Sequence, residues 1–366
     1  MKSTSLVNWM MWCDDIGQKL KDPTIDPNSI LNKVLRTKEI STFPVGLIPI
    51  AIDWPDYYYK NGDLSEINLV IGDEKFSLDE SEIKLIDYTP NSIAFIIQFK
   101  NIEVSYKYVL QNQSYVVKKT SNKEINIVKK DFSQVALHDE FSQNCSPVVY
   151  FSDGSKVFDS FHIVRPEGYT IPHIHKDCFV KFEWTIDIRK ESQGNTKDSN
   201  SIQYVLLSEL KQKNYWFIFN DDGAGEIADI VAFKEENGLL LIEFYHLKFS
   251  QKSLAGSRIG DFYEVCGQVI KNCKWVGELD NIINHLKARE RKRINQDQSS
   301  RIEQGEYRSF DHLKVHGGRL KKEYKIFIVQ PGLDINLLSN DVAALLGATD
   351  LYVKETTGKN LTVIAS

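Results

Sequence analysis

The order in which two kinds of hydrophobic pattern follow one another constrains the fold of this chain most. From Phe43 to about Val128, short apolar runs such as INLVIG and IAFIIQF alternate with clusters of Asp, Asn, Gly and Pro. Such runs, rich in β-branched and aromatic residues, are typical of antiparallel strands. Similar runs continue over 148–189 and include FVKFEWTIDIR, while 6–20 has the spacing of a short amphipathic helix. The pattern predicts a β-rich module that displays no recognisable chemistry.

The later part of the chain contains both helix-like and strand-like hydrophobic patterns. Helical spacing occurs at 201–213, 261–275, 279–293 and 340–356, and strand-like runs occur at 214–219, 226–233, 239–250, 324–332 and 360–366. The resulting order, α-β-β-β-α-β-α-β, is typical of a mixed α/β domain. We therefore predict a β-rich module with a short leading helix over 1–145 and a mixed α/β domain over 146–366, ending in a β-α-β extension.

Charge and cysteine usage narrow the function classes. A net charge of −5 excludes a uniformly basic nucleic-acid coat, although it is compatible with a local basic groove. The five cysteines form no C-x-x-C pair, which argues against a zinc site or a disulfide framework. No long apolar run and no signal-peptide pattern occur, so we expect a cytoplasmic protein without membrane association.

Potentially catalytic residues gather between positions 229 and 268. Asp229 lies early in one strand, whereas His246 and Lys248 lie two apart on the next strand and so share a face. Glu264 and Gln268 follow on one face of a predicted helix. Hydrolysis of a phosphodiester needs an activated water and stabilisation of extra negative charge, which a cation held by carboxylates provides. The pattern predicts a Mg²⁺ or Mn²⁺ site.

These segments resemble the PD-(D/E)XK nuclease superfamily of restriction enzymes, repair nucleases and bacterial anti-phage systems. The superfamily core is α-β-β-β-α-β, like the order expected over about 201–330, and its acid and lysine correspond to Asp229 in GEIADIVAF and Lys248 in IEFYHLK. Three sequence segments resemble nuclease-type domains attached to, or encoded beside, helicases in bacterial defence loci: DDGAGEIADIVAF, YHLKFS and RIGDFYEVCGQ. The resemblance covers less than half the chain and implies a restriction-endonuclease-like core.

One position departs from the superfamily pattern, because His246 stands where an acid is usual. Three solutions stay open: His246 binds the metal or orients water, Glu264 supplies the carboxylate from the helix, or a bulge brings Glu243 round from the opposite face. We favour Glu264, since it requires no strand distortion. Glu226 and Glu191 are weaker candidates. The expected metal ligands are thus Asp229, Glu264 and His246, with Gln268 as a positioning residue.

The resemblance implies an endonuclease that hydrolyses DNA in anti-phage defence, with an ATP-driven partner such as a helicase. The chain has no Walker motif of its own. In the run LKARERKR we expect phosphate contacts from five residues: Lys287, Arg289, Arg291, Lys292 and Arg293. A nuclease-like subunit that binds nucleic acid without cutting is the alternative, and RNA as ligand and a homo-oligomer stay open. His173 and His175 lack a third ligand, so we predict no metal there.

Overall fold

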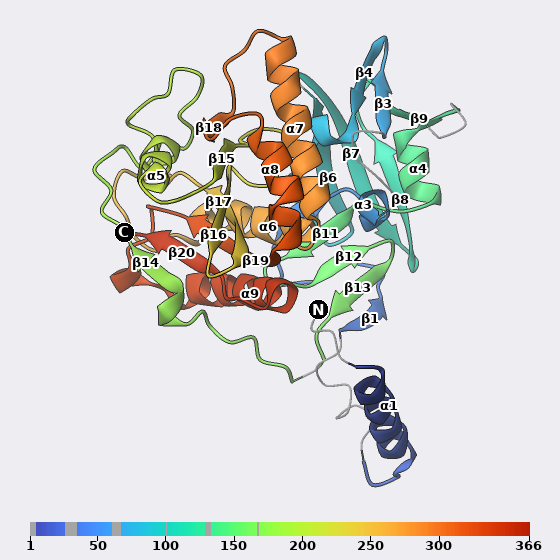
Figure 1. The fold of residues 1–366 in the computed structure, drawn as a ribbon. Coiled ribbons are helices and arrows are strands. Elements are labelled where there is room, and N and C mark those ends of the chain that lie inside the picture. Colours follow the sequence, from blue (N-terminus) through green and yellow to red (C-terminus); the bar gives the residue numbers. More distant parts are fainter. Residues whose placement is uncertain (1–4, 26–34, 61–66, 100, 129–132, 167) are drawn as a thin grey trace.

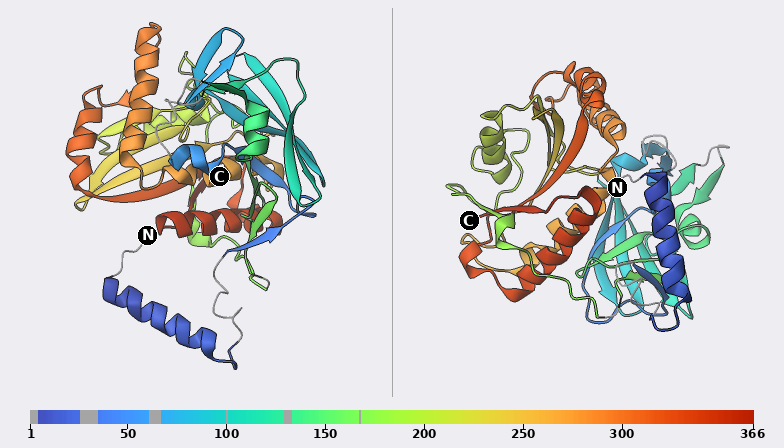
Figure 2. Two further views of the ribbon diagram at one scale, coloured as in Figure 1. Left: turned by 90° about the vertical axis from the view of Figure 1, so that its right-hand side faces the viewer. Right: turned by 60° about the horizontal axis from the view of Figure 1, so that its bottom comes forward.

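The computed structural model describes residues 5–25, 35–60, 67–99, 101–128, 133–166 and 168–366. It is a mixed α/β protein, as predicted, with a β-rich part and an α/β part side by side (Figure 1). Helix α1 (Leu6–Lys21) confirms the predicted N-terminal helix, begins at the capping residue Ser5 and buries none of its residues. It projects from the body in Figure 1 and in the left view of Figure 2. Among the described residues, no helix combines the length and apolarity needed to cross a membrane.

Two antiparallel sheets form most of the β-rich part. The first, in the order β5-β6-β7-β8, consists of β5 (Glu82–Thr89), β6 (Ser92–Phe99), β7 (Ile102–Gln111) and β8 (Ser114–Lys119). The second, in the order β10-β9-β3-β4, consists of β3 (Asn68–Ile71), β4 (Glu74–Ser77), β9 (Asn126–Val128) and β10 (Gln134–Ala136). Strand β6 alternates between buried and less buried residues, because one face packs on the core. Helix α4 (Leu137–Gln143) contacts β8.

A third sheet crosses the predicted boundary near residue 145. Its order is β1-β13-β12-β11-β2, with β1 (Arg36–Glu39), β2 (Pro49–Asp53), β11 (Val148–Phe151), β12 (Lys156–Phe158) and β13 (Phe161–Val164). Strands β11 to β13 follow the predicted boundary in sequence, yet they pair with strands that precede it. Pairing of strands about 100 residues apart leaves no trace in local periodicity, so the sequence pattern could not locate this sheet.

The α/β part is built on a mixed sheet in the order β14-β20-β19-β17-β16-β15-β18. Its strands are β14 (Phe179–Lys181), β15 (Phe217–Asn220), β16 (Ile230–Glu236), β17 (Leu239–Leu247), β18 (Ile302–Gln304), β19 (Lys321–Val329) and β20 (Thr362–Ala365). Strands β15 to β17 are antiparallel, and β19 is parallel to β17. Of the predicted strand FVKFEWTIDIR, only β14 forms.

Helices cover both faces of this sheet. Helix α5 (Ile202–Lys211) packs on the face that carries Tyr245 and Leu247. The other face meets α6 (Tyr263–Asn272), α7 (Leu279–Asn295), α8 (Ser309–Val315) and α9 (Asn340–Thr357). The chain therefore runs α5-β15-β16-β17-α6, and α7, β18 and α8 precede β19. The order α-β-β-β-α expected from the sequence is present.

Helix α6 joins the two parts of the molecule, since it packs against β2 of the third sheet. A side chain at Gly267 would collide with the carbonyl oxygen of Ile50 and come within 2.8 Å of the Ala51 side chain. Glycine is therefore required at this contact. The short 3-10 helix that follows α6, Cys273–Trp275, adds an ion pair of 2.5 Å between Lys274 and Asp53. One hydrophobic core runs through both parts, so the β-rich part is held directly against the helix that follows β17.

Candidate metal-binding site

The hairpin of β16 and β17 places the three strand residues predicted for the site. Asp229 directly precedes β16, whose first residue Ile230 pairs with Tyr245, so Asp229 lies opposite His246. Lys248 directly follows β17. Alternation along the strands turns Asp229, His246 and Lys248 towards α6, the face that also carries Val231 and Phe244. The Asp229 carboxylate accepts a hydrogen bond of 2.8 Å from the backbone N–H of Leu247.

The residues that join Asp229 are not those predicted from the sequence. Among the described residues, Asp222, Glu226 and Asp229 bring one carboxylate oxygen each within 4.8 Å of the others. Asp222 belongs to the turn DDGAG and was not among the predicted site residues, and Glu226 was a weaker candidate. The sequence signal that could have revealed this site is the presence of three acids and two glycines within the eight residues 222–229. The turn is closed by a hydrogen bond of 2.8 Å from the Gly223 N–H to Glu226.

Electrostatics make this acid cluster, Asp222, Glu226 and Asp229, suited to a cation. Burial, with the charge of Asp222, raises the pKa of Glu226 to about 8. Burial and the charges of Glu226 and Asp222 also raise the pKa of Asp229 well above its usual range. Asp229 is buried and the other two acids are half-buried, so carboxylates at this spacing repel one another, and a divalent cation would relieve the repulsion. Three hard oxygen donors fit Mg²⁺ or Mn²⁺.

Lys248 lies beside the cluster between two further acids. Its ammonium group is 3.0 Å from Glu264 and 3.5 Å from Glu191, and its side chain is 13% exposed. Burial lowers the pKa of Lys248, but the two carboxylates outweigh burial and the net shift is upward. Lys248 therefore carries its charge at neutral pH. Glu264, which we predicted as a metal ligand, pairs with this lysine instead of entering the acid cluster.

Glu191 reaches the site from the segment before α5. Its carboxylate also accepts a hydrogen bond of 2.8 Å from the backbone N–H of Phe249, which ties it to the residue after Lys248. Burial raises the pKa of Glu191, partly opposed by the charge of Lys248. Glu191 was one of the weaker candidates in the sequence, where it lies 57 residues before Lys248. A contact at that separation depends on how α5 packs against the sheet.

His246 occupies the position of the missing acid but is fully buried. Neither ring nitrogen has a hydrogen-bond partner among the described residues. Burial, and then the charge of Lys271, lower the pKa of His246 to about 3, so the imidazole is neutral. Glu243 lies on the opposite face, as alternation predicts, where it accepts hydrogen bonds from Tyr215 and Tyr245 at 2.5 and 2.7 Å. The pairing of β16 with β17 has no bulge that would turn Glu243 to the face of the sheet that carries Asp229.

Gln268 connects α6 to the acid cluster. Its side-chain amide N–H donates to Glu226 over 3.4 Å. Glu264 and Gln268 are four residues apart on α6 and so share one face of the helix. One of them contacts Lys248 and the other contacts the cluster. The helix face predicted from the sequence therefore does lie against the site.

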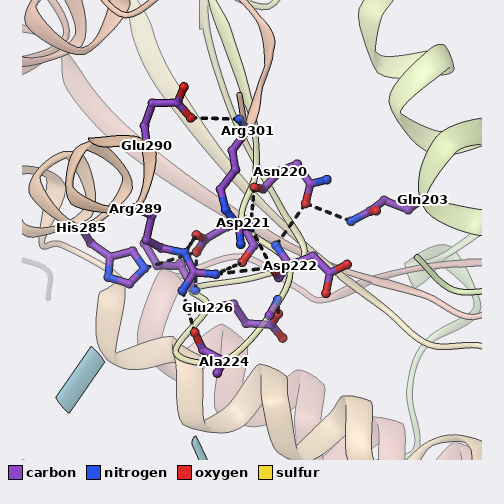
Figure 3. Close-up of polar contacts among 12 residues, drawn as sticks. Gln203, Asn220, Asp221, Asp222, Ala224, Glu226, His285, Arg289, Glu290 and Arg301 are labelled. Atoms are coloured by element: carbon purple, nitrogen blue, oxygen red, sulfur yellow. Dashed lines mark hydrogen bonds and ion pairs between the residues drawn. The ribbon is translucent and has the colours of Figure 1, made fainter. Parts of the chain in front are cut away.

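Two arginines hold the turn that carries the cluster (Figure 3). The Arg289 guanidinium donates to the carbonyl oxygens of Asp221 and Ala224 over 2.7 and 2.6 Å, and it approaches the Asp221 carboxylate to 2.5 Å. Burial raises the pKa of Asp221, but Arg289 and His285 outweigh burial and lower it. We predicted Arg289 as a phosphate contact. Its donors are instead engaged with the turn.

Arg301 completes this hold on the turn from the segment between α7 and β18. Its guanidinium donates to the carbonyl oxygens of Asp222 and Asn220 over 2.7 and 3.1 Å (Figure 3). Burial, with the charge of Arg289, lowers the pKa of Arg301 to about 10. Its own backbone N–H donates to Glu290 of α7 over 2.9 Å. The backbone of Asn220, Asp221, Asp222 and Ala224 is thus fixed by cations from α7 and the segment after it.

The other four basic residues of α7 also have partners within the protein. Lys287 pairs with Asp311 at 3.0 Å, and Arg291 donates to the Tyr307 hydroxyl over 2.8 Å. Lys292 pairs with Glu80 of the β-rich part, and Arg293 donates to Asn195 over 3.1 Å and to Gln298. Acids therefore compensate the charges of Lys287 and Lys292, and neutral side chains engage donors of Arg291 and Arg293, which we predicted to contact phosphates.

A cleft of about 390 Å³ opens beside the acid cluster. One wall comes from the β-rich part and includes Trp54 and Lys84, and the other includes Asp229, Gln268 and Lys271. The arrangement can hold a divalent cation at one end and a polar ligand along the walls. Comparison with family models, with curated proteins and with solved structures found no match to this chain.

Proposed function

We propose that this chain is a metal-dependent nuclease of the PD-(D/E)XK type that hydrolyses phosphodiester bonds in DNA. One observation carries the proposal: an acid cluster with raised pKa values and a charged lysine lie at the same end of the β16–β17 hairpin. The order α5-β15-β16-β17-α6, followed later by β19 parallel to β17, supports a restriction-endonuclease-like core.

Each residue then has a distinct task. Asp229, Asp222 and Glu226 would hold Mg²⁺ or Mn²⁺, and the chemistry supplied by the bound cation is activation of water and stabilisation of charge on the phosphate. Lys248, held by Glu191 and Glu264, presents a fixed positive charge to the developing negative charge. Gln268 orients Glu226 through its amide N–H.

The proposed metal set replaces Glu264 and His246 by Asp222 and Glu226. A neutral histidine enclosed in the core offers no open path to an ion that sits in the cleft. An all-oxygen ligand set favours Mg²⁺ over softer ions. Metal titration should therefore show weakened binding in Glu226→Gln and much smaller changes in Glu264→Gln and His246→Ala.

A second function, nucleic-acid binding without cutting, is favoured by one observation. The position where the superfamily resemblance expects an acid carries the buried His246. In that case the chain would serve as a binding or assembly subunit. The proposed role in anti-phage defence and the proposed helicase partner rest on the sequence resemblance alone.

Plasmid cleavage in Mg²⁺ or Mn²⁺ tests the proposal. We expect wild-type protein to cut and Asp229→Ala to lose cutting by a factor of about 10³ or more, with an unchanged fold by circular dichroism. Asp311→Ala, an exposed acid on α8, is the matched control and should cut normally. Absence of metal-dependent cutting in wild type, or full cutting by Asp229→Ala, would favour the second function.

A further inference from the structure

The cleft beside the acid cluster has walls from two parts of the chain that are distant in sequence. From the β-rich part come Trp54, which follows β2, and Lys84 of β5. From the α/β part come Gln268, Lys271 and Asn272 of α6, together with the acid cluster. The β-rich part therefore contributes directly to the space in which a substrate would lie.

Three residues that line this cleft carry buried polar atoms with unmet hydrogen-bonding capacity. Trp54 and Asn272 are 3% and 2% exposed, and neither the indole N–H nor the Asn272 amide nitrogen has a hydrogen-bond partner among the described residues. The side-chain oxygen of Gln268 is likewise buried without a partner in the described part of the chain. Each such group destabilises a folded protein, and nearly all buried polar groups are satisfied. Their grouping along one cleft points to a ligand that supplies the partners.

The mixture of donors and acceptor limits what the ligand can be. Two of the unmet groups donate and one accepts. A phosphate offers acceptors alone, whereas the edge of a nucleobase offers both donors and acceptors. The walls therefore suit a base rather than an isolated phosphate.

A cation suited to a phosphate lies on the same helix. Lys271 lines the cleft three residues after Gln268, and no ion pair engages it within the described part of the chain. The neighbouring lysines differ, because Lys274 pairs with Asp53 at 2.5 Å and Lys84 with Glu82 at 3.3 Å. Lys271 is thus available for a negatively charged ligand group close to the acid cluster.

We propose that this cleft binds one nucleotide of single-stranded DNA, with its base against Trp54 and Asn272 and its phosphate near Lys271. The DNA class rests on the nuclease function proposed above. A volume of about 390 Å³ suits a ligand of nucleotide size. In an intact duplex the pairing edges are occupied by the partner strand, so a base can enter such a cleft only from a single strand or after extrusion. The β-rich part thus contributes to selection of single strands.

Equilibrium binding measured by fluorescence anisotropy tests the proposal independently of cleavage. The probes are a labelled 12-nucleotide single strand, the same sequence as a duplex, and unlabelled deoxynucleoside monophosphate as competitor, all in Ca²⁺. We expect the single strand to bind at least ~10-fold more tightly than the duplex, and the monophosphate to compete only at far higher concentration. Equal affinity for the duplex, or a monophosphate that competes as well as the strand, would overturn the proposal.

Two substitutions locate the binding within the cleft. Asn272→Leu and Trp54→Phe each remove one unmet donor, and each should weaken single-strand binding by roughly 3- to 10-fold. Because the lost donor has no protein partner, Asn272→Leu should leave the melting temperature unchanged or raise it. Asn281→Leu, which removes an exposed amide bonded to Glu278 on α7, is the matched control and should bind normally.

The outcomes separate this proposal from the nuclease proposal. Weakened binding in both variants of a protein that never cuts would support the cleft and refute the nuclease function. Unchanged binding in Trp54→Phe and in folded Asn272→Leu would refute the cleft, even where Asp229→Ala abolishes cutting. Should Asn272→Leu fail to fold, Trp54→Phe alone decides.

Discussion

Two groups of charged residues, the acid cluster and the basic residues of α7, differ in how far their charges are compensated. Lys287, Arg289 and Lys292 pair with Asp311, Asp221 and Glu80, and Arg291 and Arg293 donate to the neutral Tyr307 and Asn195. In the part of the chain that the structure describes, no ion pair engages Asp222, Glu226 or Asp229, and the pKa values of Glu226 and Asp229 are raised. A group of uncompensated acids that includes the buried Asp229 is the stronger indication of a ligand site, because folding alone does not explain it.

The largest expected effect concerns Lys248, the lysine that directly follows β17 and is paired with Glu191 and Glu264. Lys248→Ala should lower the cleavage rate by roughly 10²- to 10³-fold, because its fixed charge acts on the transition state. Its melting temperature should change little, since the carboxylates that lose their partner, Glu191 and Glu264, are 26% and 62% exposed and can be solvated. Cleavage rate and thermal melt are measured on the same preparation. Normal cleavage with an unchanged melt would remove Lys248 from the site.

Breaking the compensated group should reduce stability instead. Arg289→Ala leaves the Asp221 carboxylate buried without its closest cation and frees the turn 221–224. We expect a loss of about 3–5 kcal/mol in the free energy of unfolding, measured with urea. Arg291→Ala, two residues along and bonded to a tyrosine hydroxyl, is the control and should lose less than about 1 kcal/mol. Equal, small losses would mean that Arg289 does not hold the turn.

The pH dependence of stability should reveal the uncompensated acids. A carboxyl whose folded pKa is about 8 instead of about 4.5 retains its proton on folding in that interval. The unfolded state then binds fewer protons, so the free energy of unfolding should fall as pH rises from about 4.5 to about 8, by at most about 1.4 kcal/mol per pH unit. Glu226→Gln should flatten this fall, and so should saturating Mg²⁺. A stability that rises across the interval would contradict the raised pKa.

The smallest effect is expected from the basic face of α7. Combined replacement of Lys287, Arg291 and Arg293 by Ala should change the slope of log K against log salt by less than about one unit, since Lys287 is paired with Asp311 and donors of the two arginines are engaged by Tyr307 and Asn195. The slope is measured by titration of DNA binding between low and moderate salt. A loss of about three units would restore the sequence-based prediction that these residues bind phosphates.

Local pattern determined the strands and helices around the site. Strand-like apolar runs predicted β16 and β17, helical spacing predicted α6, and the two together placed Asp229, Lys248 and Gln268 near one another. These residues lie within 40 consecutive positions, on neighbouring elements. Periodicity is sufficient at this range, because adjacent antiparallel strands and the helix that covers them share one face.

Tertiary structure alone decided the partners of those residues. Glu191 meets Lys248 through the packing of the segment before α5, and Asp222 and Glu226 meet Asp229 because Arg289 and Arg301 fix the turn between them. The third sheet likewise joins strands on both sides of residue 145. Periodicity records which face of an element is apolar, whereas the identity of the element that covers this face depends on long-range packing and hydrogen bonds.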